Sequence, residues 1–392
     1  MSKKRTIDAY FGVPQAKKAR GPDTTDSESV SERTNTRNVT NTFCSNTITS
    51  VDSEPRCYST HPSYPFPIPH LPDSLYREIS GPPARAARPI ADQPDLDLLY
   101  FEPYISRPAA QQLFQFLRSE LPFYRVEYDI ARGGTKTHIR TPRYTTVFGI
   151  DETARFELDP NSNPNLTPCS PSASSSPSVS LAERQLGKVV DARTGKPIPV
   201  GLADTPQKPK QSGQAGYRST PRPVPYCLEV VRKSAEAATG CRFNFCLVNY
   251  YASGADSISF HSDDERFLGP LPAIASFSLG ARRDFLMKHK PPEPGPRVGD
   301  GDSISRGPLK LPLGSGDMVL MRGTTQANWL HSIPKRSGKN ERDGGRINIT
   351  FRRAMVRGGT ENYYNYNVGT GPFYKWDAAS QEMKQRIPTP KP

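Results

Sequence analysis

The second half of the chain consists of short strand-like segments with little more than turns between them. Apolar and polar side chains alternate there, or β-branched and aromatic residues form short runs, and Gly-rich turns separate most of the runs. Two helical segments precede this series, and helices followed by a run of strands are typical of helices that back an antiparallel sandwich or barrel, not of a doubly wound sheet. We expect strands at 243–251, 258–263, 273–279, 284–289, 317–322 and 346–352.

The two helices are predicted from the spacing of apolar residues. The first begins near Ser106, which can cap it, with Pro108 near the first helical position. The second spans about 224–239, and Gly240 suits its C-terminal cap. The apolar face of the first helix is formed by Leu113, Phe114, Leu117 and Leu121.

Proline, glycine and serine mark the parts of the chain that we expect to lie outside a packed core. Proline accounts for 41 and glycine for 29 of the 392 residues, and residues 161–180 are dominated by serine and proline. Segments of this composition bury too little apolar surface to offset the entropy of the chain. The expected division is a disordered N-terminal region at 1–88, one domain formed by 89–155 and 217–357, a low-complexity insertion at 156–216 and a C-terminal tail at 358–392.

The balance of charges favours a polyanionic partner such as a nucleic acid. Lys and Arg number 52 against 39 Asp and Glu, which gives a formal net charge of +13. The six cysteines include no CxxC pair, so neither a disulfide framework nor a zinc finger fits. No apolar run reaches the roughly 18 residues of a membrane span, and the first residues, MSKKR, lack the apolar stretch of a signal peptide. We therefore expect no membrane association and a reducing compartment.

A histidine and an aspartate stand two residues apart in the strand expected at 258–263. Side chains alternate in a strand, so His261 and Asp263 point to the same side. An imidazole and a carboxylate in this arrangement are two of the three ligands of a facial iron site. His331 lies far enough downstream to supply the third ligand from another strand. The alternative for this pattern is a surface histidine beside acidic residues.

The strand expected at 346–352 alternates strictly between apolar and polar side chains. Guanidinium and hydroxyl groups that converge on one face suit a small dicarboxylate. On the strand expected at 243–251, Asn249 and Tyr251 share a face and can also hydrogen-bond a carboxylate. The alternative is a half-buried strand that turns its polar face to solvent. The polar face consists of Arg346, Asn348, Thr350 and Arg352.

Taken together, these residues resemble the AlkB family of Fe(II)/2-oxoglutarate-dependent dioxygenases, and more closely its nuclear eukaryotic members that repair alkylated DNA. The resemblance runs from about residue 96 to residue 353, without the insertion, and includes the string IASFSLGA. The fold that it implies is α+β, with a double-stranded β-helix (jelly-roll) core and helices packed on one face. The residues that carry it are Asn249-Tyr250-Tyr251, His261-Ser262-Asp263-Asp264-Glu265, His331 and Arg346-x-Asn348-x-Thr350-x-Arg352.

The resemblance also implies an activity and a set of roles. His261, Asp263 and His331 would hold Fe(II), and 2-oxoglutarate and O2 would be the cosubstrates. The reaction implied is oxidative demethylation of N-alkylated bases in DNA, of the 1-methyladenine and 3-methylcytosine type, with release of succinate, CO2 and formaldehyde. Arg346 would pair with the distal carboxylate of 2-oxoglutarate. The full set implied for this cosubstrate is Asn249, Tyr251, Arg346, Asn348, Thr350 and Arg352.

Contacts to the substrate base are implied as well. Asp264 is expected to contact the cationic methylated base, with a surface carboxylate as the alternative. Tyr144, Phe148 and Gly149 lie in the segment PRYTTVFG, which resembles the nucleotide-recognition lid of the family. Aromatic residues at this spacing are equally consistent with a core. The stretch 130–139 replaces the hydrophobic finger of duplex-specific relatives by a Gly-rich and basic sequence, so a preference for duplex DNA is not implied.

Residues 4–11, KRTIDAYF, resemble the peptide box that docks on the sliding clamp PCNA. Ile7, Tyr10 and Phe11 would form its one-turn hydrophobic plug. Lys4 replaces the usual Gln, and the alternative is a chance trio of residues in a disordered tail. Nearby basic runs suit nuclear import or phosphate contacts. The expectation is a nuclear monomer that binds alkylated DNA, or RNA, and PCNA.

Three other functions stay open at this point. RNA demethylation shares every metal and cosubstrate residue. A metal-dependent hydrolase can use a His/Asp/His set, but leaves the polar face of the strand at 346–352 unexplained. A catalytically inactive adaptor tethered to the clamp is the third alternative, and the complete metal and cosubstrate sets argue against it.

Overall fold

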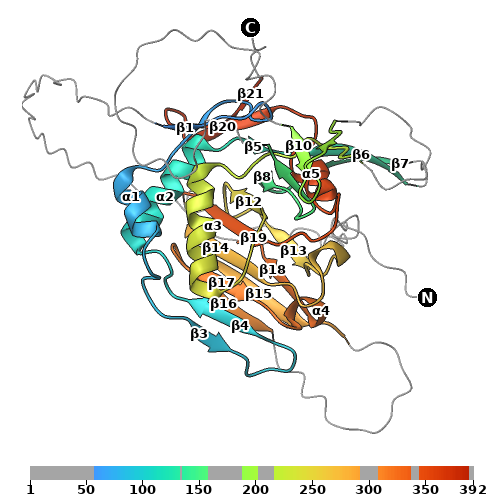
Figure 1. Ribbon diagram of the computed structural model, residues 1–392. Coiled ribbons are helices and arrows are strands. Elements are labelled where there is room, and N and C mark those ends of the chain that lie inside the picture. Colours follow the sequence, from blue (N-terminus) through green and yellow to red (C-terminus); the bar gives the residue numbers. More distant parts are fainter. Residues whose placement is uncertain are drawn as a thin grey trace, which may run out of the picture. The chain divides into compact units, whose positions relative to one another are not determined.

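The computed structural model describes residues 57–132, 135–157, 188–201, 216–291, 308–336 and 344–387 (Figure 1). All of them lie in the second of the two units of the chain, Arg56–Pro392. Each helix in these ranges is too short or too polar to cross a membrane.

A ten-stranded sheet, the major sheet, runs through this unit in the order β21-β20-β5-β8-β12-β19-β14-β17-β4-β3. Every pairing in it is antiparallel. Its strands are β3 (Arg88–Ile90), β4 (Leu98–Phe101), β5 (Phe123–Tyr124), β8 (Tyr144–Gly149), β12 (Phe245–Tyr251), β14 (Ile274–Gly280), β17 (Met318–Met321), β19 (Arg346–Arg352), β20 (Phe373–Asp377) and β21 (Glu382–Arg386).

A four-stranded antiparallel sheet, the minor sheet, has the order β13-β18-β15-β16. Side chains of both sheets pack into a shared apolar cluster, which includes Tyr251 and Met321 from the major sheet and Phe285 and Ile333 from the minor sheet. Two facing antiparallel sheets around one core form the expected jelly-roll, and the α+β class is confirmed. The strands of the minor sheet are β13 (Ile258–His261), β15 (Arg283–His289), β16 (Leu309–Leu313) and β18 (Trp329–Ile333).

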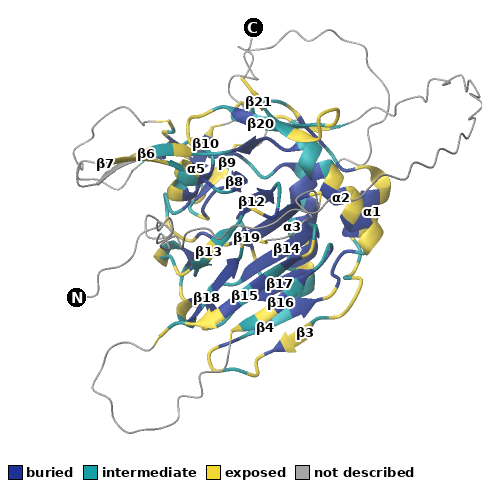
Figure 2. Cartoon of the chain, turned by 180° about the vertical axis from the view of Figure 1, so that it is seen from behind, coloured by how far each residue is buried: buried dark blue, intermediate teal, exposed yellow. Residues whose placement is uncertain are grey.

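Two helices, α2 (Arg107–Glu120) and α3 (Tyr226–Thr239), belong to the apolar cluster on the other face of the major sheet. The hydroxyl of Ser106 accepts a hydrogen bond from the Ala109 N–H, and Gly240 ends α3 with a left-handed φ of 67°, as expected. Figure 2 shows buried residues concentrated on the central strands and exposed residues on the outer sides of α1 (Asp73–Ile79) and α2. The major sheet is therefore covered by helices on one face and by the minor sheet on the other.

Order extends into regions that were expected to be disordered. Residues 57–88 contain β1 (Tyr58–Ser59), β2 (Ile68–Pro69) and α1, although their prolines had indicated a loose chain. Apolar residues of this segment, among them Leu75 and Ile79, are buried in the apolar cluster on the helix side of the major sheet, which we call the helix-side core. Their burial stabilises the segment. Leu75 and Ile79 have helical spacing, but the helix is only seven residues long and stands among prolines, so the period is too short to be distinguished from a loose chain.

The insertion and the tail also contain ordered parts. In the insertion, β10 (Val189–Asp191) and β11 (Pro197–Ile198) join β9 (Ala154–Phe156) in a small sheet with its own apolar cluster. The tail contributes α5 (Glu361–Asn367) and the strands β20 and β21. The remaining elements are the hairpin of β6 (Glu127–Arg132) and β7 (Thr135–Arg140), the 3-10 helix η2 (Arg266–Leu268) and α4 (Thr325–Asn328).

Candidate active site

The minor sheet brings the two candidate histidine ligands together. Strand β13 pairs with β18 so that His261 lies opposite His331, and the centroids of their rings are 4.2 Å apart. The two residues are far apart in the sequence, but a non-local strand pairing makes them neighbours. The sequence predicted that His331 comes from another strand, but it did not give the bounds of that strand, Trp329–Ile333.

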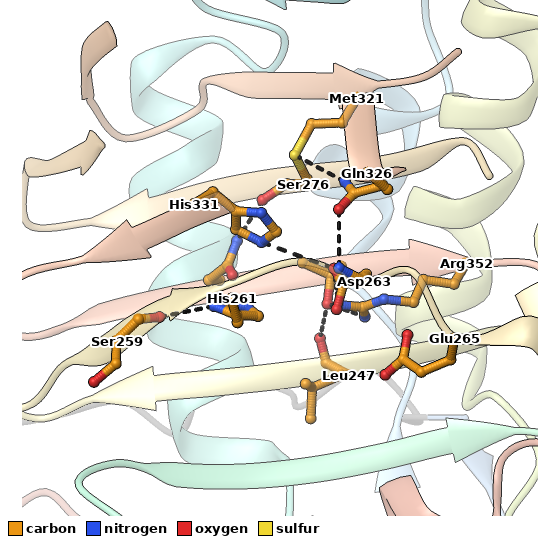
Figure 3. A network of polar contacts seen from close by, with 12 residues as sticks. Leu247, Ser259, His261, Asp263, Glu265, Ser276, Met321, Gln326, His331 and Arg352 are labelled. Carbon is orange, nitrogen blue, oxygen red and sulfur yellow. Dashed lines mark hydrogen bonds and ion pairs between the residues drawn. The ribbon is translucent and has the colours of Figure 1, made fainter. Parts of the chain in front are cut away.

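Asp263 lies just beyond the end of β13. Its position therefore depends on hydrogen bonds to neighbouring residues more than on the alternation of side chains along a strand. Its backbone N–H donates to Oε1 of Gln326 at 2.9 Å, and its Oδ2 accepts from Nη2 of Arg352 at 2.9 Å. Figure 3 shows Asp263 between His331 and Arg352, with His261 below His331. Ligand atoms of His261, Asp263 and His331 all lie within 4.8 Å of one another.

The charges of these three residues suit a divalent cation. Burial would raise the pKa of Asp263, but Arg352 and the two imidazoles more than offset this, so the pKa lies well below its usual range. Burial and the neighbouring His261 lower the pKa of His331 to about 3, and burial also lowers the pKa of His261. At neutral pH the set is one carboxylate and two neutral imidazoles, the protonation states that metal binding requires.

The orientation of His261 fits the same role. Its Nδ1 lies 2.9 Å from the carbonyl oxygen of Ser259, and a carbonyl can only accept, so Nδ1 carries the proton. The lone pair of the neutral ring is then on Nε2. A hydrogen bond of this kind sets the tautomer of metal-binding histidines in other proteins. The Nδ1 atom of His331 is buried and has no hydrogen-bond partner among the described residues.

A buried guanidinium, that of Arg346, lies on β19 of the major sheet. Arg346 on β19 stands opposite Tyr251 on β12 and is only 1% exposed. Its Nη2 donates to the hydroxyl of Ser278 at 2.7 Å, whereas Nε and Nη1 have no partner among the described residues. Burial lowers the pKa of Arg346 to about 10. A buried cation with two unused donors is costly unless an anion completes it, so this position fits the carboxylate of a ligand.

The polar face of β19 points inward, which excludes the alternative of a solvent-facing strand. Asn348 donates to the hydroxyl of Ser276 at 2.9 Å, and Thr350 accepts from Nη1 of Arg352 at 2.7 Å. Asn249 lies directly opposite Asn348 in the β12–β19 pairing. The predicted metal residues thus lie on or next to the paired strands β13 and β18, the predicted cosubstrate residues lie on the paired strands β12 and β19, and the Asp263–Arg352 ion pair joins the two sets.

Several residues of the site had not been predicted. Nε of Arg143 donates to Oδ1 of Asn249 at 2.7 Å, and the guanidinium is buried. Gln326 reaches Asp263 from α4, a helix of four residues that has no periodic pattern. Tyr363 enters from the tail, which had been left without an assigned structure. Only Arg143, as the second residue of the lid-like segment PRYTTVFG, had a signal in the sequence.

The expected base contacts of Tyr144, Phe148 and Gly149 need correction, because these residues form part of β8 inside the major sheet. Tyr144 and Phe148 pack in the helix-side core, and Phe148 has no exposed surface. A Cβ atom on Gly149 would lie 2.2 Å from the carbonyl oxygen of Asn244. These side chains face away from the candidate metal ligands, so neither aromatic ring is placed to stack on a base.

Asp264 is on the surface and has a partner of its own. Its Oδ2 accepts from Nζ of Lys290 at 2.8 Å, and its side chain is 48% exposed. The structure therefore agrees with the surface-carboxylate alternative for Asp264 in the absence of a substrate. The clamp-like residues Ile7, Tyr10 and Phe11 lie outside the described residues, so clamp binding stays a prediction.

Comparison with known proteins finds a family model that covers most of the residues of this site. Residues 170–352 match the family model described as the 2OG-Fe(II) oxygenase superfamily. The chain is 43% identical over 138 residues to alpha-ketoglutarate-dependent dioxygenase alkB homolog 3 of Rattus norvegicus, which is 34% of this chain and 44% of the relative. It is 38% identical over 160 residues to DNA oxidative demethylase ALKBH2 of Homo sapiens, which is 38% of this chain and 58% of the relative.

A plant relative is similar to the chain over a segment of comparable length. DNA oxidative demethylase ALKBH2 of Arabidopsis thaliana is 38% identical over 157 residues, which is 36% of this chain and 48% of the relative. The chain spans about half the length of the curated relatives that it matches. The matched family segment contains all three candidate metal ligands as well as Arg346 and Arg352.

Proposed function

From the premise that this chain carries a domain of the 2OG-Fe(II) oxygenase superfamily, we propose that it removes N-alkyl groups from DNA bases by oxidation. The substrates are bases of the 1-methyladenine and 3-methylcytosine type. The reaction uses Fe(II), O2 and 2-oxoglutarate and releases succinate, CO2 and formaldehyde. Two relatives of about 40% identity have names that describe DNA oxidative demethylases, which supports this choice of substrate.

The observation that carries the proposal is the pairing of two incomplete sites. His261, Asp263 and His331 offer a metal three ligands, and Arg346 offers an anion two unused guanidinium donors. Both lie on the interior side of β13, β18 and β19. A hydrolase would need the first site but not the second, whereas a 2-oxoglutarate oxygenase needs both.

The residues of the chain divide the work. His261, Asp263 and His331 would hold Fe(II), which when bound supplies the oxidative chemistry. Arg346 would bind the distal carboxylate of 2-oxoglutarate in two parallel hydrogen bonds, one from Nε or Nη1 and one from the second hydrogen of Nη2, because a guanidinium edge matches the geometry of a carboxylate. Arg352 keeps Asp263 ionised and in place. The buried walls exclude water from the cosubstrate, and the target base must leave its helical stack to reach the site.

The nucleic acid and cellular context are part of the proposal. The net charge of +13 supports a polyanionic substrate. DNA repair in the nucleus, with PCNA as a partner through residues 4–11, follows from the N-terminal sequence alone. RNA of the same chemistry is the second candidate, because the metal and cosubstrate residues do not distinguish the two.

The test is formaldehyde release from matched oligonucleotides that carry 1-methyladenine or 3-methylcytosine as single-stranded DNA, duplex DNA or RNA. We expect release that depends on 2-oxoglutarate and is faster on DNA. Release only from RNA would favour the second candidate. The absence of 2-oxoglutarate-dependent release from all three, with the protein loaded with Fe(II), would overturn the proposal.

A further inference from the structure

We infer that Tyr363, on a helix beyond the matched family segment, is a positioning residue whose hydroxyl holds Glu265 and the metal ligand Asp263 in place. The inference rests on the proposed function, which makes Asp263 a ligand of the iron. It concerns the tail, which the sequence had left unassigned. The matched segment ends at residue 352, and α5 begins at Glu361.

The hydroxyl of Tyr363 lies between two carboxylates. It is 3.0 Å from Oε1 of Glu265 and 3.4 Å from Oδ1 of Asp263. The other oxygen of Asp263, Oδ2, accepts from Arg352, and the Arg352 guanidinium lies 5.3 Å from the centre of the Tyr363 ring. Each oxygen of Asp263 is therefore approached by a different partner, one from β19 and one from α5.

Two neighbouring carboxylates create the need for such a donor. Asp263 and Glu265 are two residues apart, and the single hydroxyl of Tyr363 lies near one oxygen of each. Arg352 is bonded to Asp263, and Oε2 of Glu265 is buried without a partner among the described residues. Without the hydroxyl of Tyr363, Glu265 would lose a donor and could turn toward Arg352 or the metal. The hydroxyl thus keeps Glu265 from competing with Asp263.

The position of the hydroxyl is set by contacts that do not involve the metal ligands. The hydroxyl of Tyr364 donates to the carbonyl of Gly149 at 2.7 Å, and the hydroxyl of Thr145 donates to the carbonyl of Asn367 at 2.6 Å. The Tyr363 ring packs edge-on against Phe245. These contacts attach α5 to β8 and β12. The donor is therefore in place before a metal binds, as partners that orient metal ligands are.

The experiment compares two Tyr→Phe substitutions in the full-length protein. Tyr363→Phe removes the hydroxyl beside the carboxylates. Tyr104→Phe, the control, removes the hydroxyl of another buried tyrosine, which hydrogen-bonds the hydroxyl of Ser234 in the helix-side core. The readout is the affinity for Mn(II), measured by calorimetry without O2. Loss of a partner that orients a metal ligand typically weakens metal binding about 10- to 100-fold, so we expect at least a tenfold loss for Tyr363→Phe.

The control variant and a double substitution at Glu265 and Tyr363 complete the test. We expect Tyr104→Phe to bind Mn(II) within about twofold of wild type, because its hydroxyl bonds Ser234 and no metal ligand. In a Glu265→Gln background, the loss caused by Tyr363→Phe should be smaller than in wild type, since the contact with the Glu265 carboxylate is already gone and only the contact with Asp263 is removed. Melting temperatures without metal verify that each variant is folded. Equal losses in the two tyrosine variants, or no loss in Tyr363→Phe, would overturn the inference.

The same data separate this inference from the proposed function. A wild-type protein that binds Mn(II) but demethylates no oligonucleotide would contradict the proposed reaction, while the affinity ratio would still decide the role of Tyr363. A wild-type protein that demethylates, together with an unchanged Mn(II) affinity of Tyr363→Phe, would leave the function intact and refute the positioning role.

Discussion

At the scale of single residues, the site depends on buried charges that differ in whether they already have a partner. Asp263 and Arg352 satisfy each other at 2.9 Å. Arg346 keeps two unused donors. Removing one partner of a buried ion pair is costly, because the other charge is left uncompensated. A buried cation without a counter-ion, by contrast, can bind an anionic ligand. The first arrangement supports a metal ligand, and the second binds an anionic cosubstrate.

The metal ligands can be tested through His261. We expect His261→Ala to abolish both Fe(II) binding and turnover, because two ligands do not complete a facial site. The fold should be retained, since His261 is at the end of β13 and only partly buried. His289→Ala, an exposed histidine on β15, is the control that should retain Fe(II) binding. Wild-type activity of His261→Ala, with iron carefully controlled, would show that the metal lies elsewhere.

The cosubstrate pocket can be tested through Arg346. An ammonium cannot form the two parallel hydrogen bonds that a guanidinium offers to a carboxylate. We expect Arg346→Lys to raise the KM for 2-oxoglutarate at least tenfold, about 1.4 kcal/mol. Arg353→Lys, one residue beyond β19 and exposed, should leave this KM unchanged. If KM is the same in wild type and Arg346→Lys, Arg346 does not bind 2-oxoglutarate.

At the scale of elements, β8 explains what the sequence could and could not predict. The string YTTVFG has no alternation of apolar and polar residues, and all six residues are buried. A strand covered on both faces gives no sign of which face meets the site. Phe148 was therefore a candidate for base contact, with a core position as the alternative, and it packs in the helix-side core. By contrast, β19 separates charged from apolar residues, and its bounds and inward face were both predicted correctly.

Other elements escaped prediction because their partners are distant in sequence. Strand β18 has no turn signal before it, and its strand character depends on pairing with β13 and β15. Helix α5 lies in an Asn- and Tyr-rich stretch without an apolar period, and contacts with β8 hold it in place. Local patterns revealed most of the strands of the jelly-roll, whereas residues such as Gln326 and Tyr363 reach the site only through tertiary contacts.

The close contact between β8 and the start of β12 makes Gly149 sensitive to substitution. Its φ is +100°, and a Cβ atom would lie 2.2 Å from the Asn244 carbonyl oxygen. We expect Gly149→Ala to lower the free energy of unfolding by more than about 1 kcal/mol, because backbone strain and a clash act together.

A matched control separates strain from clash. Gly195 has a φ of +68°, but nothing lies within 4 Å of its added Cβ atom. In urea unfolding, Gly195→Ala should destabilise the protein less than Gly149→Ala does. Equal effects of the two substitutions would mean that the contact with Asn244 contributes nothing beyond the strained φ.

At the scale of the whole molecule, the N-terminal box predicts a tether that is independent of catalysis. A peptide of residues 1–20 should bind the sliding clamp with a Kd of about 1 μM, since ordering a flexible segment offsets part of the contact energy. Replacing both Tyr10 and Phe11 by Ala should eliminate this binding while demethylation of free oligonucleotides continues. Calorimetry that gives the two peptides the same clamp affinity would refute the tether.

The last strands of the described chain lie beside one of its early strands. Phe373 and Tyr374 of β20 pair with Tyr124 and Phe123 of β5, and β5 in turn pairs with β8. A ribosome releases β20 long after β5, so one edge of β5 stays open during the synthesis of all the residues between them. Pairings between such distant residues form slowly, and open edges attract other chains in the meantime. This edge of the sheet can therefore close only after β20 has been made, and a nascent chain stalled before β20 should depend on chaperones to stay soluble.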